Sequence, residues 1–513
     1  MLIHPWVERS LAVLGAYYLY CQVRKVKLST LVRVVPGAQQ LLDQQLETEV
    51  DGAMENMFNT EGLSEQLNSI PEIGMHQKEL LTKMQGWKDS NGVEKGKLFA
   101  YVYDSDVDTI WETVQAAHNI FMVDNALNPV AFPTLRYLEN EVVGMAISML
   151  HGPPEACGVM STGGTESILL AVKTYRDRAR AIWPHITEPE IVLPASGHPA
   201  FFKAAHYLGL TAIAVPIDPI TMLPRMDQYA KSISHKTILL VGSAPAYPHG
   251  VMDPLEEIAI LAEKHNLPMH VDACIGGFLL PWVEKLGYPV PAWDFRLPAV
   301  TSISADVHKY GYAAKGASLI IYANPSLRKH QFFAYTSWPG GLFLSPSVLG
   351  TRGGGSIAGA YAAMCALGQD GYTRLADRIM KTRDALVAGI NAIDGLQVLG
   401  APVMSIISFA STEAAIDILA VADVMESKYG WSMERQQCPP SLHFSLMPSH
   451  GKLVEDLLQN LAASVQAIRD DPSLTSQGTA AMYGMVAKIP DGSIVESFLT
   501  QLTHKLYSRP ALE

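Results

Sequence analysis

The chain has 513 residues, of which 48% are hydrophobic and only 17% charged, which excludes intrinsic disorder and predicts a large buried core. Lys and Arg total 38 against 50 for Asp and Glu, and the resulting net charge of −12 excludes a non-specific nucleic-acid binder, which needs a basic face. The five cysteines include no CxxC pair, so neither a disulfide framework nor a metal site is expected, and a reducing, cytoplasmic compartment is the default.

Residues 1–60 are predicted to form an N-terminal helical segment. Its most apolar run, Leu11 to Cys21, is followed by Arg24, Lys25 and Lys27. The run is too short to cross a bilayer, which takes about 20 apolar residues. Two interpretations stay open: an interfacial anchor with a basic flank that contacts the membrane peripherally, or an amphipathic helix packed on the body or on a partner subunit.

Residues 61–370 are predicted to contain an N-terminal extension followed by a large α/β domain. The stretch from Leu135 to Leu150 has apolar residues at helical spacing. Short apolar runs then recur, mostly at intervals of βαβ units, and predict a mostly parallel seven-stranded sheet. The runs are Gly158–Met160, Ile191–Leu193, Ala212–Val215, Ile238–Val241, Met269–Val271, Ser302–Ser304 and Leu319–Tyr322. The last interval is too short for a helical crossover, so the final strand is expected to run antiparallel to its neighbour.

Residues 371–513 are predicted to form a smaller C-terminal α+β domain, with the boundary near residue 370. A helix rich in Lys and Arg opens it, and Met404 to Phe409 and Leu442 to Leu446 read as strands.

Four motifs at the strand ends carry candidate chemistry. Ser161 to Ser167 is a small-residue turn before a helix, which suits an anion site but also an ordinary helix cap. Asp272 ends a strand, where it could bind a ligand or simply cap the strand. Lys309 follows another strand, and a buried lysine can form a Schiff base, whereas an exposed one would be an ordinary surface charge. His198, in a strand-to-helix turn, could stack on a planar ligand or be structural.

Together, a phosphate cradle, a strand-end acid and a strand-end lysine are what a pyridoxal phosphate site requires. The strings Gly-Gly-Thr-Glu-Ser (163–167), His-Val-Asp-Ala-Cys-Ile-Gly-Gly-Phe (270–278) and Ser-Ile-Ser-Ala-Asp-Val-His-Lys-Tyr-Gly-Tyr-Ala-Ala-Lys-Gly (302–316) closely resemble the sphingosine 1-phosphate lyases, fold-type-I enzymes of the group II decarboxylase family. The resemblance runs from about Tyr101 to the C-terminus.

The resemblance implies pyridoxal 5'-phosphate as the cofactor, with a role for each matching residue. Lys309 would hold the cofactor as an imine, Asp272 would pair with the ring nitrogen and His198 would stack on the ring. The remaining implied residues are Gly164, Thr165, His308 and Asn125 around the cofactor, Lys315, Tyr103 and Tyr247 as further catalytic groups, and Asn128, Arg352 and Tyr483 toward the substrate.

The resemblance further implies a homodimer, because the loop from Gly350 to Gly355 is similar to one that family members contribute across the dimer interface. The implied reaction is cleavage of the C2–C3 bond of a phosphorylated sphingoid base, giving a long-chain aldehyde and phosphoethanolamine. Asn128 stands where the family usually has a histidine, and it can donate a hydrogen bond but carries no positive charge. Two rival functions stay open: an amino-acid decarboxylase with the same fold and cofactor, or a non-catalytic membrane-associated relative.

Overall fold

The computed structural model describes residues 44, 47–48, 50–52, 69–89, 96–471, 473–474 and 492–508. The chain divides into two units, Val93–Thr475 and a second formed by Met1–Gly92 with Ser476–Glu513. In the second unit the described helices are α4 (Gln77–Asp89) and α17 (Gly492–Leu506). The Leu11–Cys21 run and Tyr483 lie outside the described residues. No helix in the described part of the chain is long and apolar enough to span a membrane.

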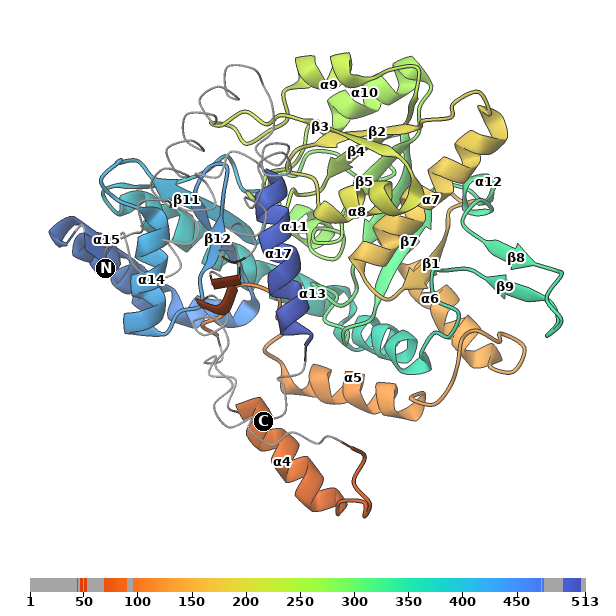
Figure 1. The fold of residues 1–513 in the computed structure, drawn as a ribbon, viewed down its shortest axis with the longest axis horizontal. Helices are drawn as coiled ribbons and strands as arrows, with labels where there is room; N and C mark the ends of the chain where they lie inside the picture. The colour runs from red at the N-terminus through yellow and green to blue at the C-terminus, as the bar shows by residue number, and fades with distance from the viewer. Residues whose placement is uncertain are drawn as a thin grey trace. The chain divides into compact units, whose positions relative to one another are not determined.

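The larger unit is built on a seven-stranded sheet with the order β1-β7-β6-β5-β4-β2-β3, which confirms the predicted sheet (Figure 1). Its strands are β1 (Cys157–Ser161), β2 (Glu190–Pro194), β3 (Thr211–Val215), β4 (Thr237–Ser243), β5 (Met269–Asp272), β6 (Val300–Ala305) and β7 (Ser318–Tyr322). Each overlaps one of the predicted runs. The neighbouring strands β3 and β2, β2 and β4, β4 and β5, and β5 and β6 are parallel. Strand β7 is antiparallel to both β6 and β1, and the short interval between β6 and β7 predicted the first of these pairings.

Helices cover the sheet, which explains why its central strands are apolar along their whole length: all residues of β4 are buried. The helices between the strands are α7 (Gly164–Ile182), α8 (Pro199–Leu208), α9 (Met226–Ser232), α10 (Leu255–His265) and α11 (Leu280–Lys285). One core cluster joins α7 and α8 to the sheet through residues such as Ile168, Phe201, Leu239 and Ile320. This packing fixes where each strand ends and therefore where the motif residues lie.

Three further helices and a hairpin precede the second, smaller sheet along the chain. They are α5 (Asp108–Ile120), α6 (Pro133–Met149), α12 (Pro325–Arg328), and the hairpin of β8 (Phe333–Tyr335) and β9 (Phe343–Ser345). The helix α6 confirms the predicted helical stretch from Leu135. The hairpin projects at the right of Figure 1, and all three residues of β8 are exposed.

A second sheet follows the long helix α13 (Gly354–Ala392), which breaks at Gly368, where φ is 58° and the chain takes a conformation that favours glycine. This break lies beside the predicted boundary near 370, which stays a prediction. The later elements are β10 (Leu396–Val398), β11 (Ile406–Ser411), α14 (Ile418–Tyr429), β12 (Glu434–Gln436), β13 (Ser441–Ser445), the 3-10 helix η1 (Pro448–Leu453) and α15 (Val454–Asp470). The sheet has the order β10-β11-β13-β12, and β11 and β13 confirm both strands predicted there.

Candidate active site

The predicted cofactor residues, with the exception of Asn125, gather where the strands of the large sheet end. Thr162 to Gly164 follow β1, His198 follows β2, Asp272 ends β5, and Asp306 to Lys309 follow β6. The carboxyl ends of parallel strands share one edge of a sheet, the edge at which α/β folds bind ligands. A cavity of about 390 Å³ opens there, lined by Thr162, Gly163, Gly164, Thr165, Glu166, Ile168, His198, Cys274, Asp306, His308 and Lys309.

Lys309 is paired with a buried carboxylate. Its Nζ lies 3.0 Å from Oδ2 of Asp306, whose side chain is 1% exposed, and Nε2 of His308 lies 3.5 Å from the same oxygen. Burial by itself would lower the pKa of the Lys309 amine, but the Asp306 charge outweighs it and the net shift is upward. Burial opposes ionisation of Asp306, yet Lys309 and His308 hold its pKa well below the usual range. The pair is therefore charged, and the amine must lose a proton before it can attack a carbonyl.

Asp272 is fixed as a buried hydrogen-bond acceptor. One of its carboxylate oxygens accepts from the backbone N–H of Cys274 at 3.1 Å and from the hydroxyl of Ser304 at 3.2 Å. Ser304 belongs to β6 and lies opposite Asp272 in the ladder, so the neighbouring strand orients the carboxylate. An oriented, poorly solvated carboxylate is the group needed to keep a ring nitrogen protonated.

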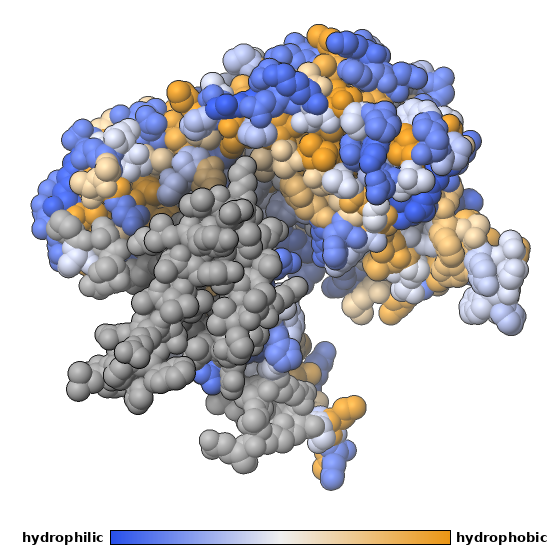
Figure 2. Space-filling model, turned by 45° about the horizontal axis from the view of Figure 1, so that its top comes forward, coloured by the Kyte–Doolittle hydropathy of each residue, from blue (hydrophilic) through white to orange (hydrophobic). Residues whose placement is uncertain are grey.

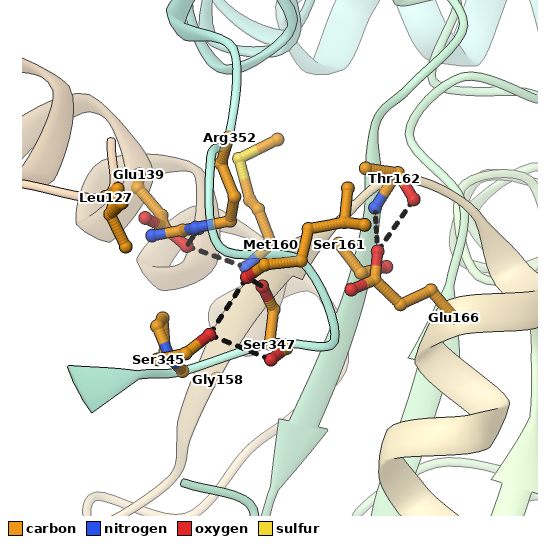
Figure 3. Close-up of polar contacts among 12 residues, drawn as sticks. Leu127, Glu139, Gly158, Met160, Ser161, Thr162, Glu166, Ser345, Ser347 and Arg352 are labelled. Carbon is orange, nitrogen blue, oxygen red and sulfur yellow. Dashed lines mark hydrogen bonds and ion pairs between the residues drawn. The ribbon is translucent and has the colours of Figure 1, made fainter. Parts of the chain in front are cut away.

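The turn after β1 leaves no room for a side chain at Gly164. A Cβ built there would lie 2.8 Å from both Oδ2 of Asp306 and Sγ of Cys274. The carboxylate of Glu166 accepts hydrogen bonds from the backbone N–H and the hydroxyl of Thr162, both at 2.7 Å (Figure 3). These contacts hold the turn at the start of α7, where the first N–H groups have no partner inside the helix and suit a phosphate. The positions of Gly164 and Thr165 fit their predicted role.

His198 is held as a neutral ring in the cavity wall. Its Nδ1 accepts a hydrogen bond from the backbone N–H of Ala200 at 3.1 Å, which places the ring at the start of α8. Burial lowers its pKa, although the nearby Asp272 charge opposes the shift. A flat, neutral imidazole is suited to stacking on an aromatic ligand, as predicted.

The three further catalytic candidates, Lys315, Tyr103 and Tyr247, lie within electrostatic reach of Lys309. The Nζ of Lys315 donates to the backbone oxygen of Tyr101 at 2.9 Å and lies 4.8 Å from the centre of the Tyr103 ring. Burial and the Lys309 charge lower the pKa of Lys315. Burial raises the pKa of both Tyr103 and Tyr247. The structure thus brings these groups together beside the cofactor residues.

Asn125, Asn128 and Arg352 lie in a different place. Asn128 and Arg352 line a second cavity of about 590 Å³, whose other lining residues include Phe332, Trp338 and Phe343 of the hairpin region. The Oδ1 of Asn128 accepts from the backbone N–H groups of the two residues after Pro129, at 3.1 and 3.0 Å.

The Asn125 and Arg352 side chains are both engaged by neighbouring groups. Asn125 accepts the Arg352 backbone N–H at 3.3 Å. The guanidinium of Arg352 donates to the buried carboxylate of Glu139 at 2.7 Å, and the same oxygen accepts the backbone N–H of Met160 (Figure 3). Within one chain, the predicted site residues therefore fall into two groups.

Among the residues that contact these groups, the following were not assigned from the sequence: Asp306, Cys274, Ser304, Glu139 and His443. Asp306 stands three residues before Lys309, and its spacing could have suggested an ion pair with the lysine. His443, whose ring packs on Tyr247, comes from β13, more than 130 residues after Lys309, and no local motif connects it with the site.

Comparison of the chain with known proteins identifies its family. Residues 97–411 match the pyridoxal-dependent decarboxylase conserved domain. The chain belongs to this family. Sphingosine-1-phosphate lyase of Arabidopsis thaliana is 38% identical over 486 residues, which is 93% of this chain and 88% of that protein. Sphingosine-1-phosphate lyase 1 of Mus musculus is 37% identical, over 94% of this chain and 85% of that protein.

Solved structures agree with the fold. The sphingosine-1-phosphate lyase of Burkholderia pseudomallei is similar with a TM-score of 0.80 and 36% identity, covering 88% of this chain and all of that one. A Lactobacillus brevis glutamate decarboxylase has a TM-score of 0.68 at 20% identity, covering 80% of this chain and 97% of that one, a likeness in fold alone. These findings confirm the fold-type-I prediction and the pyridoxal phosphate cofactor of the family. The Lys309 cavity with its glycine turn, and the buried Asp272 next to the lining residue Cys274, fit that cofactor.

Proposed function

We propose that this protein is a sphingosine-1-phosphate lyase, a carbon–carbon lyase that cleaves the C2–C3 bond of phosphorylated sphingoid bases to a long-chain aldehyde and phosphoethanolamine. The observation that carries the proposal is the ion pair of Lys309 with the buried Asp306 at the end of β6, facing the glycine turn after β1 across one cavity. The similarity to lyases over most of the chain supplies the substrate class.

Each cofactor-binding residue has a task that its surroundings support. Lys309 would hold the cofactor aldehyde covalently, Gly164 and Thr165 would bind its phosphate at the start of α7, and His308 would neighbour that phosphate. Asp272 would keep the ring nitrogen protonated, and His198 would stack on the ring. When bound, the cofactor supplies an electron sink for the bond that breaks.

Side chains of this protein would carry out the proton transfers of the reaction. Cleavage between C2 and C3 requires a base that takes the proton of the 3-hydroxyl group. Lys315, Tyr103 and Tyr247 are the candidates near Lys309. Burial and the charge of Lys309 lower the pKa of Lys315, the direction that favours a neutral amine base. Its position next to Tyr103 also suits binding of the substrate phosphate.

The second group of residues supports a homodimer. The cavity at Asn128 and Arg352 is bordered by large apolar residues of the hairpin region, and Phe333, Tyr335 and Trp338 there are about half exposed. Figure 2 shows hydrophobic residues among hydrophilic ones on one face of the molecule. Exposed aromatic side chains of this kind are typical of interfaces. Asn125, Asn128 and Arg352 would then serve the site of the partner subunit, and a substrate-binding role of Tyr483 stays a prediction.

A cytoplasmic location belongs to the same proposal. The proposal rests on the scattered cysteine spacing, and the four described cysteines, Cys157, Cys274, Cys365 and Cys438, are free. Peripheral contact of residues 1–60 with the membrane is a separate prediction. Flotation of the full chain with anionic vesicles tests it, with neutral vesicles as the control.

A product assay tests the proposed activity. The purified protein with pyridoxal phosphate is incubated with sphingosine 1-phosphate, and hexadecenal and phosphoethanolamine are quantified. Lys309→Ala should abolish both turnover and the visible absorbance of the bound cofactor, and Lys309→Arg, which keeps the charge, should fail equally because it forms no imine. Release of carbon dioxide from amino acids without aldehyde would assign the protein to the decarboxylases instead. A protein that binds no cofactor would support a non-catalytic relative.

A further inference from the structure

The carboxylate of Glu166 joins two segments that lie far apart in the sequence. Its Oε2 accepts the backbone N–H and the hydroxyl of Thr162 in the glycine turn (residues 162–164), both at 2.7 Å. Its Oε1 accepts the backbone N–H of Val348 at 2.9 Å, 182 residues further along the chain. Because the Glu166 side chain is buried, water competes little for either oxygen. One side chain therefore connects the glycine turn with residues 345–352, called here the Arg352 segment.

A second carboxylate makes a similar connection from the strand before the turn. Oε1 of Glu139 accepts the backbone N–H of Met160 on β1 at 2.9 Å and the guanidinium of Arg352 at 2.7 Å (Figure 3). Glu166 lines the cavity at Lys309, whereas Glu139 and Arg352 line the other cavity. The two carboxylates thus hold the Arg352 segment to the end of β1, and this segment connects the walls of the two cavities.

Polar contacts rather than apolar burial hold the middle of the Arg352 segment. The hydroxyl of Ser345 lies 2.9 Å from the backbone oxygens of both Ser347 and Leu349, and the Ser347 hydroxyl donates to the same Leu349 oxygen at 3.1 Å. The side chains of Val348 and Leu349 are both exposed. Burial of apolar surface therefore contributes little here, and the hydrogen bond from Val348 to Glu166 ties this part of the segment to the large sheet.

The charge of Glu166 is unfavourable for the ligand expected beside it. Glu166 lies in the first turn of α7, next to the N–H groups that suit the cofactor phosphate. A carboxylate near a phosphate weakens the binding of the phosphate by charge repulsion. Its three hydrogen bonds have the opposite effect, because they hold the turn in one conformation. Neutralising Glu166 therefore changes phosphate affinity in opposite directions, depending on whether its charge or its hydrogen bonds matter more.

We propose that Glu166 is a positioning residue that couples the glycine turn to the Arg352 segment, so that cofactor phosphate bound at the turn orders the segment. Fixing the turn fixes the Glu166 carboxylate, and with it the N–H of Val348. By linkage the effect is reciprocal, and an ordered segment strengthens phosphate binding. The inference rests on the proposed function in one respect: if Arg352 serves the partner's site, the coupling connects the cofactor of one subunit with the site of the other.

Two substitutions break the connection from opposite ends, and each has a matched control. Glu166→Gln keeps the size of the side chain but turns an amide N–H toward one set of donors. Val348→Pro removes the N–H and leaves Glu166 in place, whereas Val348→Ala keeps the N–H and changes only an exposed side chain. Glu257→Gln is the control for Glu166, because Glu257 is an exposed acid in the first turn of α10.

The first readout is cofactor affinity, measured on the full chain by equilibrium dialysis with pyridoxal phosphate and with pyridoxal, which lacks the phosphate. Glu166→Gln and Val348→Pro should each weaken pyridoxal phosphate binding about tenfold, as expected for one lost hydrogen bond to a charged group, and change pyridoxal binding less than about twofold. Val348→Ala and Glu257→Gln should bind both ligands as the wild type does. A role of Glu166 through its charge alone predicts tighter binding of pyridoxal phosphate to Glu166→Gln.

The second readout is amide hydrogen exchange in the Arg352 segment, with α15 as the reference. Pyridoxal phosphate should slow exchange of this segment several-fold in the wild type and in both controls, and pyridoxal should not. The slowing should disappear in Glu166→Gln and in Val348→Pro. If Glu166→Gln does not fold, Val348→Pro carries the test.

The inference is overturned if the folded variants bind pyridoxal phosphate at least as tightly as the wild type, or if the cofactor slows exchange of their Arg352 segment as it does in the wild type. Failure of the proposed function looks different. The wild-type protein would then release no aldehyde from sphingosine 1-phosphate, whereas both readouts use the cofactor alone and would still test the coupling.

Discussion

The cavity at Lys309 and the cavity at Arg352 are built in different ways. Around Lys309, the polar groups come from the ends of neighbouring strands and their partners lie within the same chain, as the Asp306 and Ser304 contacts show. Around Arg352, polar groups stand beside exposed aromatic residues of the hairpin region. In the first cavity, the charged groups Lys309 and Asp306 are paired with each other. Around the second cavity, aromatic side chains of the hairpin region remain about half exposed in the part of the chain that the structure describes. The difference indicates which part of the site one chain supplies alone.

The largest expected effect comes from removing the charge opposite Lys309. Asp306→Asn leaves a buried lysine without its counter-charge, so burial prevails and the pKa of Lys309 falls. Loss of one partner of a buried pair costs about 3–5 kcal/mol in stability if the lysine stays charged. Denaturant unfolding and the pH profile of cofactor absorbance measure the two effects.

The control for Asp306 is Asp227→Asn on α9. Asp227 pairs with Lys231 at 3.3 Å, both side chains are well exposed, and such pairs are worth about 0–1 kcal/mol. If both variants lost the same stability, the charged pair at Lys309 would have no special role, and the contrast between the two cavities would lose its basis.

Arg352→Met tests the second cavity. It leaves the Glu139 carboxylate buried with only the Met160 N–H as donor, and we expect a loss approaching about 3 kcal/mol in unfolding free energy. Arg374→Met, at an exposed pair with Asp370, should cost less than about 1 kcal/mol.

Mixing experiments extend this prediction to the dimer. If Arg352 serves the partner's site, inactive Arg352→Met and Lys309→Ala chains should regain part of the activity when they are refolded together. Mixtures that stay inactive, with hybrid dimers demonstrated by mass spectrometry, would place both groups in one chain's site.

A smaller effect is expected at the glycine turn. Gly164→Ala brings a methyl group to 2.8 Å from Asp306 and Cys274, and such overpacking costs about 1–3 kcal/mol. At the neighbouring Gly163, the nearest atom to an added methyl group is Cε1 of His308 at 3.5 Å, an ordinary contact. Weakened cofactor binding, measured by equilibrium dialysis, should follow the first substitution and not the second. Equal losses would show that the turn needs flexibility rather than space.

The sequence was sufficient to predict those elements and site residues whose pattern lies within one short stretch of the chain. Every strand of the large sheet was predictable because its apolar run is bounded by turns, and Asp272 and Lys309 could be found because strand ends place their residues at one edge. The pair Arg352–Glu139 was not predictable, since 213 residues separate its members and each would read as an ordinary helix or loop charge. His443, which packs on Tyr247, was missed for the same reason. This contact follows from the packing of β13, and a strand pattern carries no information about its neighbours in space.

The smallest expected effect concerns Asn128, where the family resemblance implies a histidine. Asn128 is exposed and uses its Oδ1 to accept backbone N–H groups, so a histidine there would lose this cap and gain a charge only at low pH. An exposed charge contributes about 0.2–1 kcal/mol to binding, so Asn128→His should lower KM for sphingosine 1-phosphate by less than about tenfold, and more at pH 6 than at pH 8. Asn128→Gln, which stays neutral, should show no such pH dependence. If both variants behave alike, the second cavity does not face the substrate phosphate, and its residues act on the dimer interface alone.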